Sequence, residues 1–125
     1  MIVAGFGFRA GASADALRDA YDRACNAAAV KQADLLATPA DKAAQPAFGT
    51  MAKGLSLPVV PIPDAALQTQ TTQTQSVAAQ AARATGSVAE AAALAALGRG
   101  ARLLAPRAIS SDRTATCAIA TGPKT

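Results

Sequence analysis

Three short segments of the sequence carry residues that could bind an anion or transfer a proton. The first is Gly5-Phe6-Gly7-Phe8-Arg9, where glycines allow a ligand to approach the backbone and Arg9 offers a bidentate cation. The second is Asp41-Lys42, and the third is Gly86-Ser87-Val88-Ala89-Glu90, which contains the only glutamate. The basic side chains could bind carboxylates, whereas Asp41 or Glu90 could act as a general acid or base. The candidate ligand-binding residues are Gly5, Gly7, Arg9, Lys42, Gly86, Ser87 and Glu90.

The glycine-rich segment has two other interpretations. One is a simple turn after a strand, and the other is the dinucleotide-binding fingerprint GxGxxG/A, which residues 5–10 match in letters. That fingerprint needs a helix that opens inside the motif, but the capping residue Ser13 lies beyond the glycines. It also needs an acid at the end of the second strand, where this chain has Thr38-Pro39. These departures disfavour a dinucleotide, and we expect no bound cofactor.

The other two segments also have structural explanations. Asp41-Lys42 follows a predicted strand, so Lys42 could reach a carboxylate ligand, but an exposed acid–base pair that opens a helix fits equally well. A helix that begins after Ser87 would attract anions to its free N–H groups. The same spacing of Ser87 and Glu90 is a capping box, in which both side chains serve only their own helix. The residues alone leave these alternatives open.

Several functional classes are excluded or disfavoured by composition. The 125 residues include no histidine, which excludes a Ser-His-Asp triad and histidine metal ligands, and we expect no metal site. The two cysteines, Cys25 and Cys117, lie in separate apolar stretches and are expected to be buried, reduced thiols. The net charge is +4, but the basic residues are scattered and tryptophan is absent, so nucleic acid is not an expected partner. No apolar run could span a membrane and the start lacks a signal-peptide pattern, so we expect a cytoplasmic protein.

Hydrophobic periodicity and capping residues predict the elements that position these segments. Ser13 can cap the first helix, whose apolar residues recur at helical spacing, and three prolines mark residues 57–63 as an edge strand. The Gln/Thr-rich stretch 68–75 has no apolar face and is expected to be a mobile loop. We expect helices over 14–29, 46–54, 76–83 and 88–97, and strands over 1–8, 34–38, 57–63, 102–105 and 114–120.

This order of elements predicts one domain over residues 1–125, of the three-layer α/β/α class. Its sheet should be five-stranded, mixed and mostly parallel, with an antiparallel edge made by a C-terminal hairpin that turns at 110–113. Ligands of such sheets bind beyond the carboxyl ends of the strands. We therefore expect Arg9, Lys42 and Glu90 to converge on one cleft.

Four stretches of the chain together resemble a known family. They are VAGFGFRAGAS, ATPADKAAQPAFGTMAKGLSLPVVPIPDAAL, TGSVAEAAALAALGRGARLLAPR and TATCAIA, of which the GSVAEAAAL segment is the most distinctive. In this order, and over nearly the whole chain, they resemble CobE and the C-terminal domain of the cobalamin-biosynthesis protein CbiG. One departure is Pro106-Arg107, where the family tends to have a lysine after an apolar strand.

The resemblance implies a cytoplasmic role in making the corrin ring of vitamin B12. CbiG proteins open a lactone on a ring intermediate, whereas CobE-like proteins are free-standing versions of the C-terminal domain. The function implied is binding or handing on a carboxylate-rich corrinoid or precorrin intermediate, with another cobalamin-pathway enzyme as a candidate partner. The alternative is a hydrolase-like enzyme of the same pathway, with Glu90 or Asp41 as acid or base. Phe6 or Phe8 could contact the apolar face of the ring.

Overall fold

The computed structural model describes residues 1–68 and 87–123 of the chain. The strands are β1 (Ile2–Phe8), β2 (Leu35–Pro39), β3 (Val59–Ile62), β4 (Arg102–Leu103), β5 (Ala108–Ile109) and β6 (Ala115–Thr121). The helices are α1 (Ala14–Ala28), α2 (Ala40–Ala43), α3 (Pro46–Leu55), α4 (Asp64–Gln68) and α6 (Val88–Leu97). The predicted helix over 76–83, Gly86 and the predicted loop over 68–75, apart from Gln68, lie outside the described residues.

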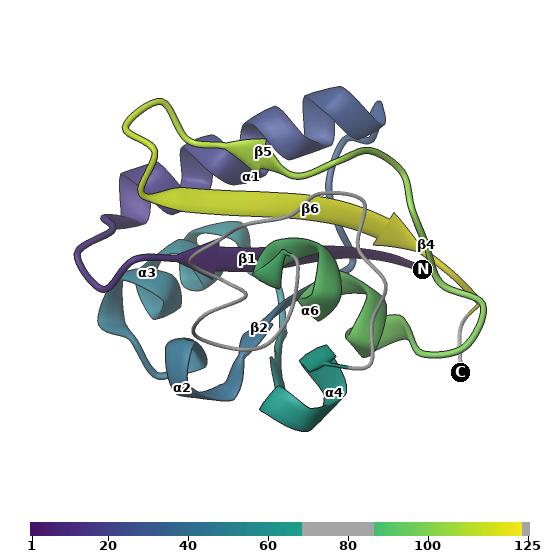
Figure 1. The fold of residues 1–125 in the computed structure, drawn as a ribbon. Coiled ribbons are helices and arrows are strands. Elements are labelled where there is room, and N and C mark those ends of the chain that lie inside the picture. The colour runs from purple at the N-terminus through teal and green to yellow at the C-terminus, as the bar shows by residue number, and fades with distance from the viewer. Residues whose placement is uncertain (69–86, 124–125) are drawn as a thin grey trace.

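The sheet has the strand order β3-β2-β1-β6-β4, with β5 also paired to β6 (Figure 1). Strands β1, β2 and β3 are parallel to one another, whereas β6 is antiparallel to β1, β4 and β5. The predicted α/β class with a mostly parallel mixed sheet is therefore confirmed, and β3 is the edge strand that its prolines indicated. The predicted antiparallel C-terminal hairpin is also present, with β6 paired to β1 on one side and to the edge strands β4 and β5 on the other.

The opposite edge of the sheet is interrupted. The strand predicted over 102–105 ends at Leu103, and pairing with β6 resumes only at Ala108. Pro106 lies in this break and has no N–H group to donate to β6. The break leaves two short strands, β4 and β5, at this edge, so the sheet has six strands where five were expected.

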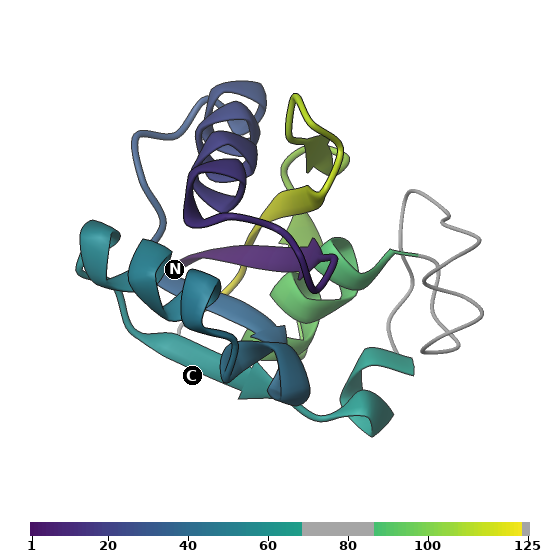
Figure 2. The same ribbon diagram turned by 90° about the vertical axis from the view of Figure 1, so that its left-hand side faces the viewer.

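Helices cover both faces of the sheet, as Figure 2 shows, with α1 and α3 on one side and α4 and α6 on the other. Along β1, Ala4 and Phe6 point into the core beneath α1 and α3, while Val3 points toward α6. The first core contains aromatic rings, whereas half of the buried residues in the second come from α6, among them three alanines. This alternation along one strand is what a sheet buried on both faces requires.

Local sequence accounts for most helix boundaries. Ser13 is the N-cap of α1 and its hydroxyl accepts a hydrogen bond of 3.0 Å from the Ala16 N–H. Helix α1 ends one residue earlier than predicted because Ala29 adopts a left-handed conformation with φ 58°. Helix α3 begins with Pro46 at its first turn, where a missing N–H group has no cost. Within the described residues, no helix is long and apolar enough to cross a membrane.

Candidate functional site

The carboxyl ends of the parallel strands and the start of α6 lie at the same end of the sheet. Strand β2 leads directly into α2, which carries Lys42, and β1 leads into Arg9 (Figure 1). Helix α6 begins beside the end of β1, since a Cβ built on Gly7 would lie 3.1 Å from the Val88 Cβ. We call Phe8, Arg9 and Lys42 the strand-end site. Ser87, at the start of α6, is fully buried.

The contact between Lys42 and Phe8 is the clearest feature of the strand-end site. The Lys42 ammonium lies 5.3 Å from the centroid of the Phe8 ring, which is cation–π distance. The Phe8 ring stacks on Phe48 with centroids 5.7 Å apart and an interplanar angle of 3°, and Phe48 is fully buried. Phe6, the other aromatic proposed to meet a ligand, is fully buried as well, so only Phe8 can reach one from the surface.

Arg9 is held in place by its backbone rather than by its side chain. Its N–H donates a hydrogen bond of 2.9 Å to the carbonyl of Thr114, at the end of the turn between β5 and β6. The Arg9 side chain is exposed. The backbone of Arg9 is therefore fixed directly after Phe8, and its guanidinium is exposed to solvent.

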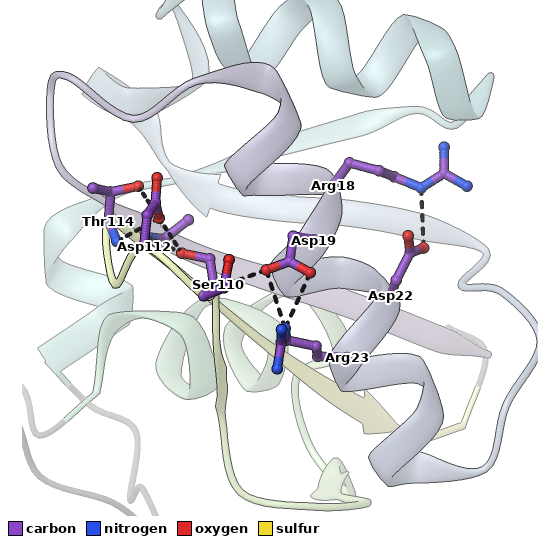
Figure 3. Close-up of polar contacts among 9 residues, drawn as sticks. Arg18, Asp19, Asp22, Arg23, Ser110, Asp112 and Thr114 are labelled. Atoms are coloured by element: carbon purple, nitrogen blue, oxygen red, sulfur yellow. Dashed lines mark hydrogen bonds and ion pairs between the residues drawn. The ribbon is translucent and has the colours of Figure 1, made fainter.

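The turn that anchors Arg9 is organised by Asp112 (Figure 3). The Asp112 carboxylate accepts hydrogen bonds from the Ser110 hydroxyl at 2.7 Å and from the Thr114 hydroxyl at 2.8 Å. These bonds, with that from Ser110 the strongest influence, hold the pKa of Asp112 below its usual value. A turn with this many internal bonds gives Arg9 a fixed backbone position.

A second carboxylate joins the same turn to α1. Asp19 accepts a hydrogen bond of 2.8 Å from the Ser111 backbone N–H and one of 3.0 Å from Arg23 (Figure 3). The Ser111 bond and then the Arg23 bond hold the pKa of Asp19 below its usual value. Sequence alone places Asp19 only on the exposed face of α1, so its link to a turn 92 residues away was not predictable.

Gly5 and Gly7 lie inside β1, as the strand predicted over residues 1–8 requires, and not in the turn or ligand loop that the glycines also suggested. Both point toward α6. A Cβ built on Gly5 would lie 2.1 Å from the Ala89 carbonyl oxygen and 2.5 Å from the Ala93 nitrogen. The close backbone approach that these glycines allow is that of α6, and a ligand contact at either one stays a prediction.

Glu90 is buried at the start of α6 and is bonded to the backbone near the edge of the sheet. It is 0% exposed, and its carboxylate accepts a hydrogen bond of 2.9 Å from the Arg107 backbone N–H, in the break between β4 and β5. Its own N–H donates to the Ser87 hydroxyl at 3.4 Å, so the predicted N-cap is present. The side chain therefore serves a residue outside its own helix, which the capping-box interpretation did not include. That Glu90 shares one cleft with Arg9 and Lys42 stays a prediction.

Other reactive groups in the described part of the chain include the two cysteine thiols and the other carboxylates. Cys25 and Cys117 are buried and free, as expected, and burial raises the pKa of each thiol. Among the residues of 1–68 and 87–123, no three acidic or thiol side chains are grouped as a metal site would require. What remains is a small α/β domain with two cations and an aromatic ring at the carboxyl ends of its parallel strands.

Comparisons with known proteins identify the family to which this domain belongs. Residues 2–120 match the family described as Cobalamin synthesis G C-terminus. The crystal structure of CobE, a protein from the cobalamin biosynthetic pathway, is 31% identical with a TM-score of 0.82, over 99% of this chain and 93% of that one. The cobalamin biosynthesis protein chiG from Agrobacterium tumefaciens str. C58 is 39% identical with a TM-score of 0.76, over 99% of this chain and all of that one (100%). No curated protein matches the sequence.

A third structure shares the fold alone. It is a cobalamin biosynthesis protein G homolog from Sulfolobus solfataricus, 18% identical with a TM-score of 0.71, of which this chain covers 37%. The family match and the two closer structures carry the assignment. The chain belongs to the family of cobalamin synthesis protein G C-terminal domains, and it is a cobalamin biosynthesis protein of the CobE and CbiG C-terminal type.

Proposed function

We propose that this protein binds a carboxylate-rich corrin-ring intermediate of cobalamin biosynthesis and hands it on to another enzyme of the pathway. The observation that carries the proposal is the Lys42 ammonium held over the Phe8 ring at the carboxyl end of the sheet. That position is where α/β sheets bind ligands, and the family assignment supports a ligand from this pathway. We expect the protein to act in the cytoplasm.

The charges at the strand-end site suit an anionic ligand. Arg9 and Lys42 follow neighbouring parallel strands, and the chain carries a net charge of +4. A hydrogen bond between a cation and a ligand carboxylate contributes roughly 1.5–3 kcal/mol. Two such bonds at the same end of a domain would give a ring bearing several carboxylates both affinity and orientation.

Titration of the purified protein with ring intermediates of the pathway tests the proposal, with visible absorbance as the measurement. A saturable spectral shift without a new product supports a carrier. Conversion of the ring supports the alternative, a hydrolase-like enzyme, and absence of any change at concentrations up to about 1 mM contradicts both.

Burial favours one of the two acid–base candidates of that alternative over the other. Glu90 is fully buried and bonded to the Arg107 backbone, which favours a structural role. Asp41 is exposed in the first turn of α2 and precedes Lys42, so it would be the acid or base if conversion were found.

A further inference from the structure

We propose that Phe8 is a positioning residue, whose ring holds the Lys42 ammonium ready to bind a carboxylate of the ligand. This inference rests on the proposed function and deepens it, because it assigns a role to a residue that carries no charge. It starts from the 5.3 Å separation between the Lys42 ammonium and the Phe8 ring centroid.

The Phe8 ring can restrain the Lys42 ammonium because the ring is itself packed against the aromatic core. Phe8 stacks on Phe48 at 5.7 Å, Phe48 meets Phe6 edge-on at 5.4 Å, and Phe6 stacks with Tyr21 at 6.4 Å. Phe6, Phe48 and Tyr21 are all buried. The four rings therefore form a continuous aromatic column, which we define by these residues, and Phe8 is its half-buried outer end.

Lys42 needs such a partner because its side chain is long and its helix is short. Helix α2 has four residues, which leaves the Lys42 side chain with few neighbours on its own helix. A free lysine loses rotamer freedom when it binds a ligand, and that loss lowers affinity. A ring that already restricts the ammonium removes part of this loss before the ligand arrives.

The contact with Phe8 leaves Lys42 able to bind. A cation–π contact attracts the ammonium to the ring face without consuming its N–H donors. A ligand carboxylate can therefore accept a hydrogen bond from Lys42 while the ring still restrains it. Replacement of Phe8 by an aliphatic residue should weaken carboxylate binding about two- to tenfold, although Phe8 itself donates nothing to the ligand.

The experiment is a double-mutant cycle on the full chain, with uroporphyrin as the carboxylate-rich tetrapyrrole probe and fluorescence as the measurement. The variants are Phe8→Leu, Lys42→Met and the double variant, with Phe8→Tyr as the conservative rescue and Lys31→Met as the control. Lys31 is exposed and precedes β2, so it lies at the other end of that strand. We expect Phe8→Leu to weaken binding in the wild-type background and not in the Lys42→Met background, and Phe8→Tyr and Lys31→Met to bind like wild type.

Different failures have different meanings. If Lys42→Met weakens binding and Phe8→Leu does not, or if their effects are independent, the role of Phe8 is wrong while the proposed function stands. If the folded wild-type protein binds neither uroporphyrin nor a pathway ring, the proposed function is wrong and this inference falls with it. If Phe8→Leu fails to fold, NMR of the wild-type protein tests the contact between Lys42 and Phe8 directly. A ring-current shift of the Lys42 side-chain protons supports the contact, and its absence would overturn it.

Discussion

The Glu90 carboxylate accepts a hydrogen bond of 2.9 Å from the backbone N–H of Arg107, 17 residues further along the chain. Glu90 lies in the first turn of α6 and is fully buried, and Arg107 lies where the sheet edge between β4 and β5 is interrupted. The Arg107 N–H, which has no partner strand in this break, therefore donates to a side chain of helix α6. This bond joins the second helical layer to the edge of the sheet.

Substitution of Glu90 should separate a structural from a catalytic role. Glu90→Gln keeps an acceptor for the Arg107 N–H, so we expect the free energy of unfolding to fall by less than about 1 kcal/mol. Glu90→Ala leaves that N–H without its partner, and we expect a loss of about 1–3 kcal/mol, measured by urea denaturation. Asp15→Ala is the control, since Asp15 is exposed in the first turn of α1 and should change stability by no more than about 1 kcal/mol.

Two outcomes would contradict the structural role of Glu90. One is a Glu90→Ala variant as stable as the wild type. The other is a pathway activity that Glu90→Gln reduces by about 10²–10⁴ at unchanged stability, which would instead mark Glu90 as an acid or base.

Gly5 should be intolerant of any side chain. A Cβ at this position would lie 2.1 Å from the Ala89 carbonyl oxygen, so Gly5→Ala must push α6 away from β1. We expect a loss of about 3 kcal/mol or more in the free energy of unfolding, or failure to fold. Gly49→Ala is the matched control, because Gly49 lies in α3 with nothing within 4 Å of a built Cβ. That variant should be more stable by about 0.5–1 kcal/mol, and equal stability of the two variants would refute the close packing of α6.

Loss of either cation at the strand-end site should weaken ligand binding without unfolding the protein. We expect Arg9→Ala and Lys42→Ala each to weaken binding of a pathway ring by about ten- to a hundredfold, from the loss of a charge-assisted hydrogen bond. Affinity should also fall as salt concentration rises. The controls are Lys31→Ala and Arg99→Ala, two exposed cations remote in sequence from the site, which should bind as wild type does. Isothermal titration calorimetry checks all four, and unchanged affinity in both site variants would reject the carboxylate model.

Acid should loosen the turn between β5 and β6. The pKa of Asp19 and of Asp112 lies below the usual 3.8 in the folded protein, so both carboxylates contribute stability above pH 3.8. That contribution is lost as pH falls from there through the folded pKa values. The Asp19→Asn variant should therefore lose less stability than the wild type between neutral pH and about pH 2, measured by thermal unfolding. A pH profile parallel to that of wild type would show that Asp19 contributes nothing here.

Capping residues and prolines were sufficient to predict the helices and strands next to them in the sequence. Ser13 and Ser87 both cap the helices predicted after them, since an N-cap depends only on residues three positions apart. The prolines at 58, 61 and 63 correctly marked β3 as an edge strand. The five-residue helix α4 was not predicted, because it is too short to show an apolar face.

Features that depend on distant residues could not be predicted from the sequence. Nothing near Gly5 shows that α6 packs against it, so its small size was interpreted as space for a ligand. Likewise, Ser87 and Glu90 fit a capping box, but the bond to Arg107 depends on where the sheet edge breaks. The contact of Lys42 with Phe8 is likewise not predictable, because the two residues lie in separate segments of the sequence.

The position of β6 has a consequence for how the chain folds as it is synthesised. Strand β1 is synthesised before the other strands of this domain, yet its seven pairings with β6 run from Ile2 with Thr121 to Phe8 with Ala115. Until residue 121 emerges, one side of β1 has only unpaired N–H and C=O groups, which is a template for pairing with other chains. Contacts so distant in sequence also close slowly. We expect nascent chains that stop before residue 115 to stay unfolded and prone to aggregate, with folding completed only after β6 has left the ribosome.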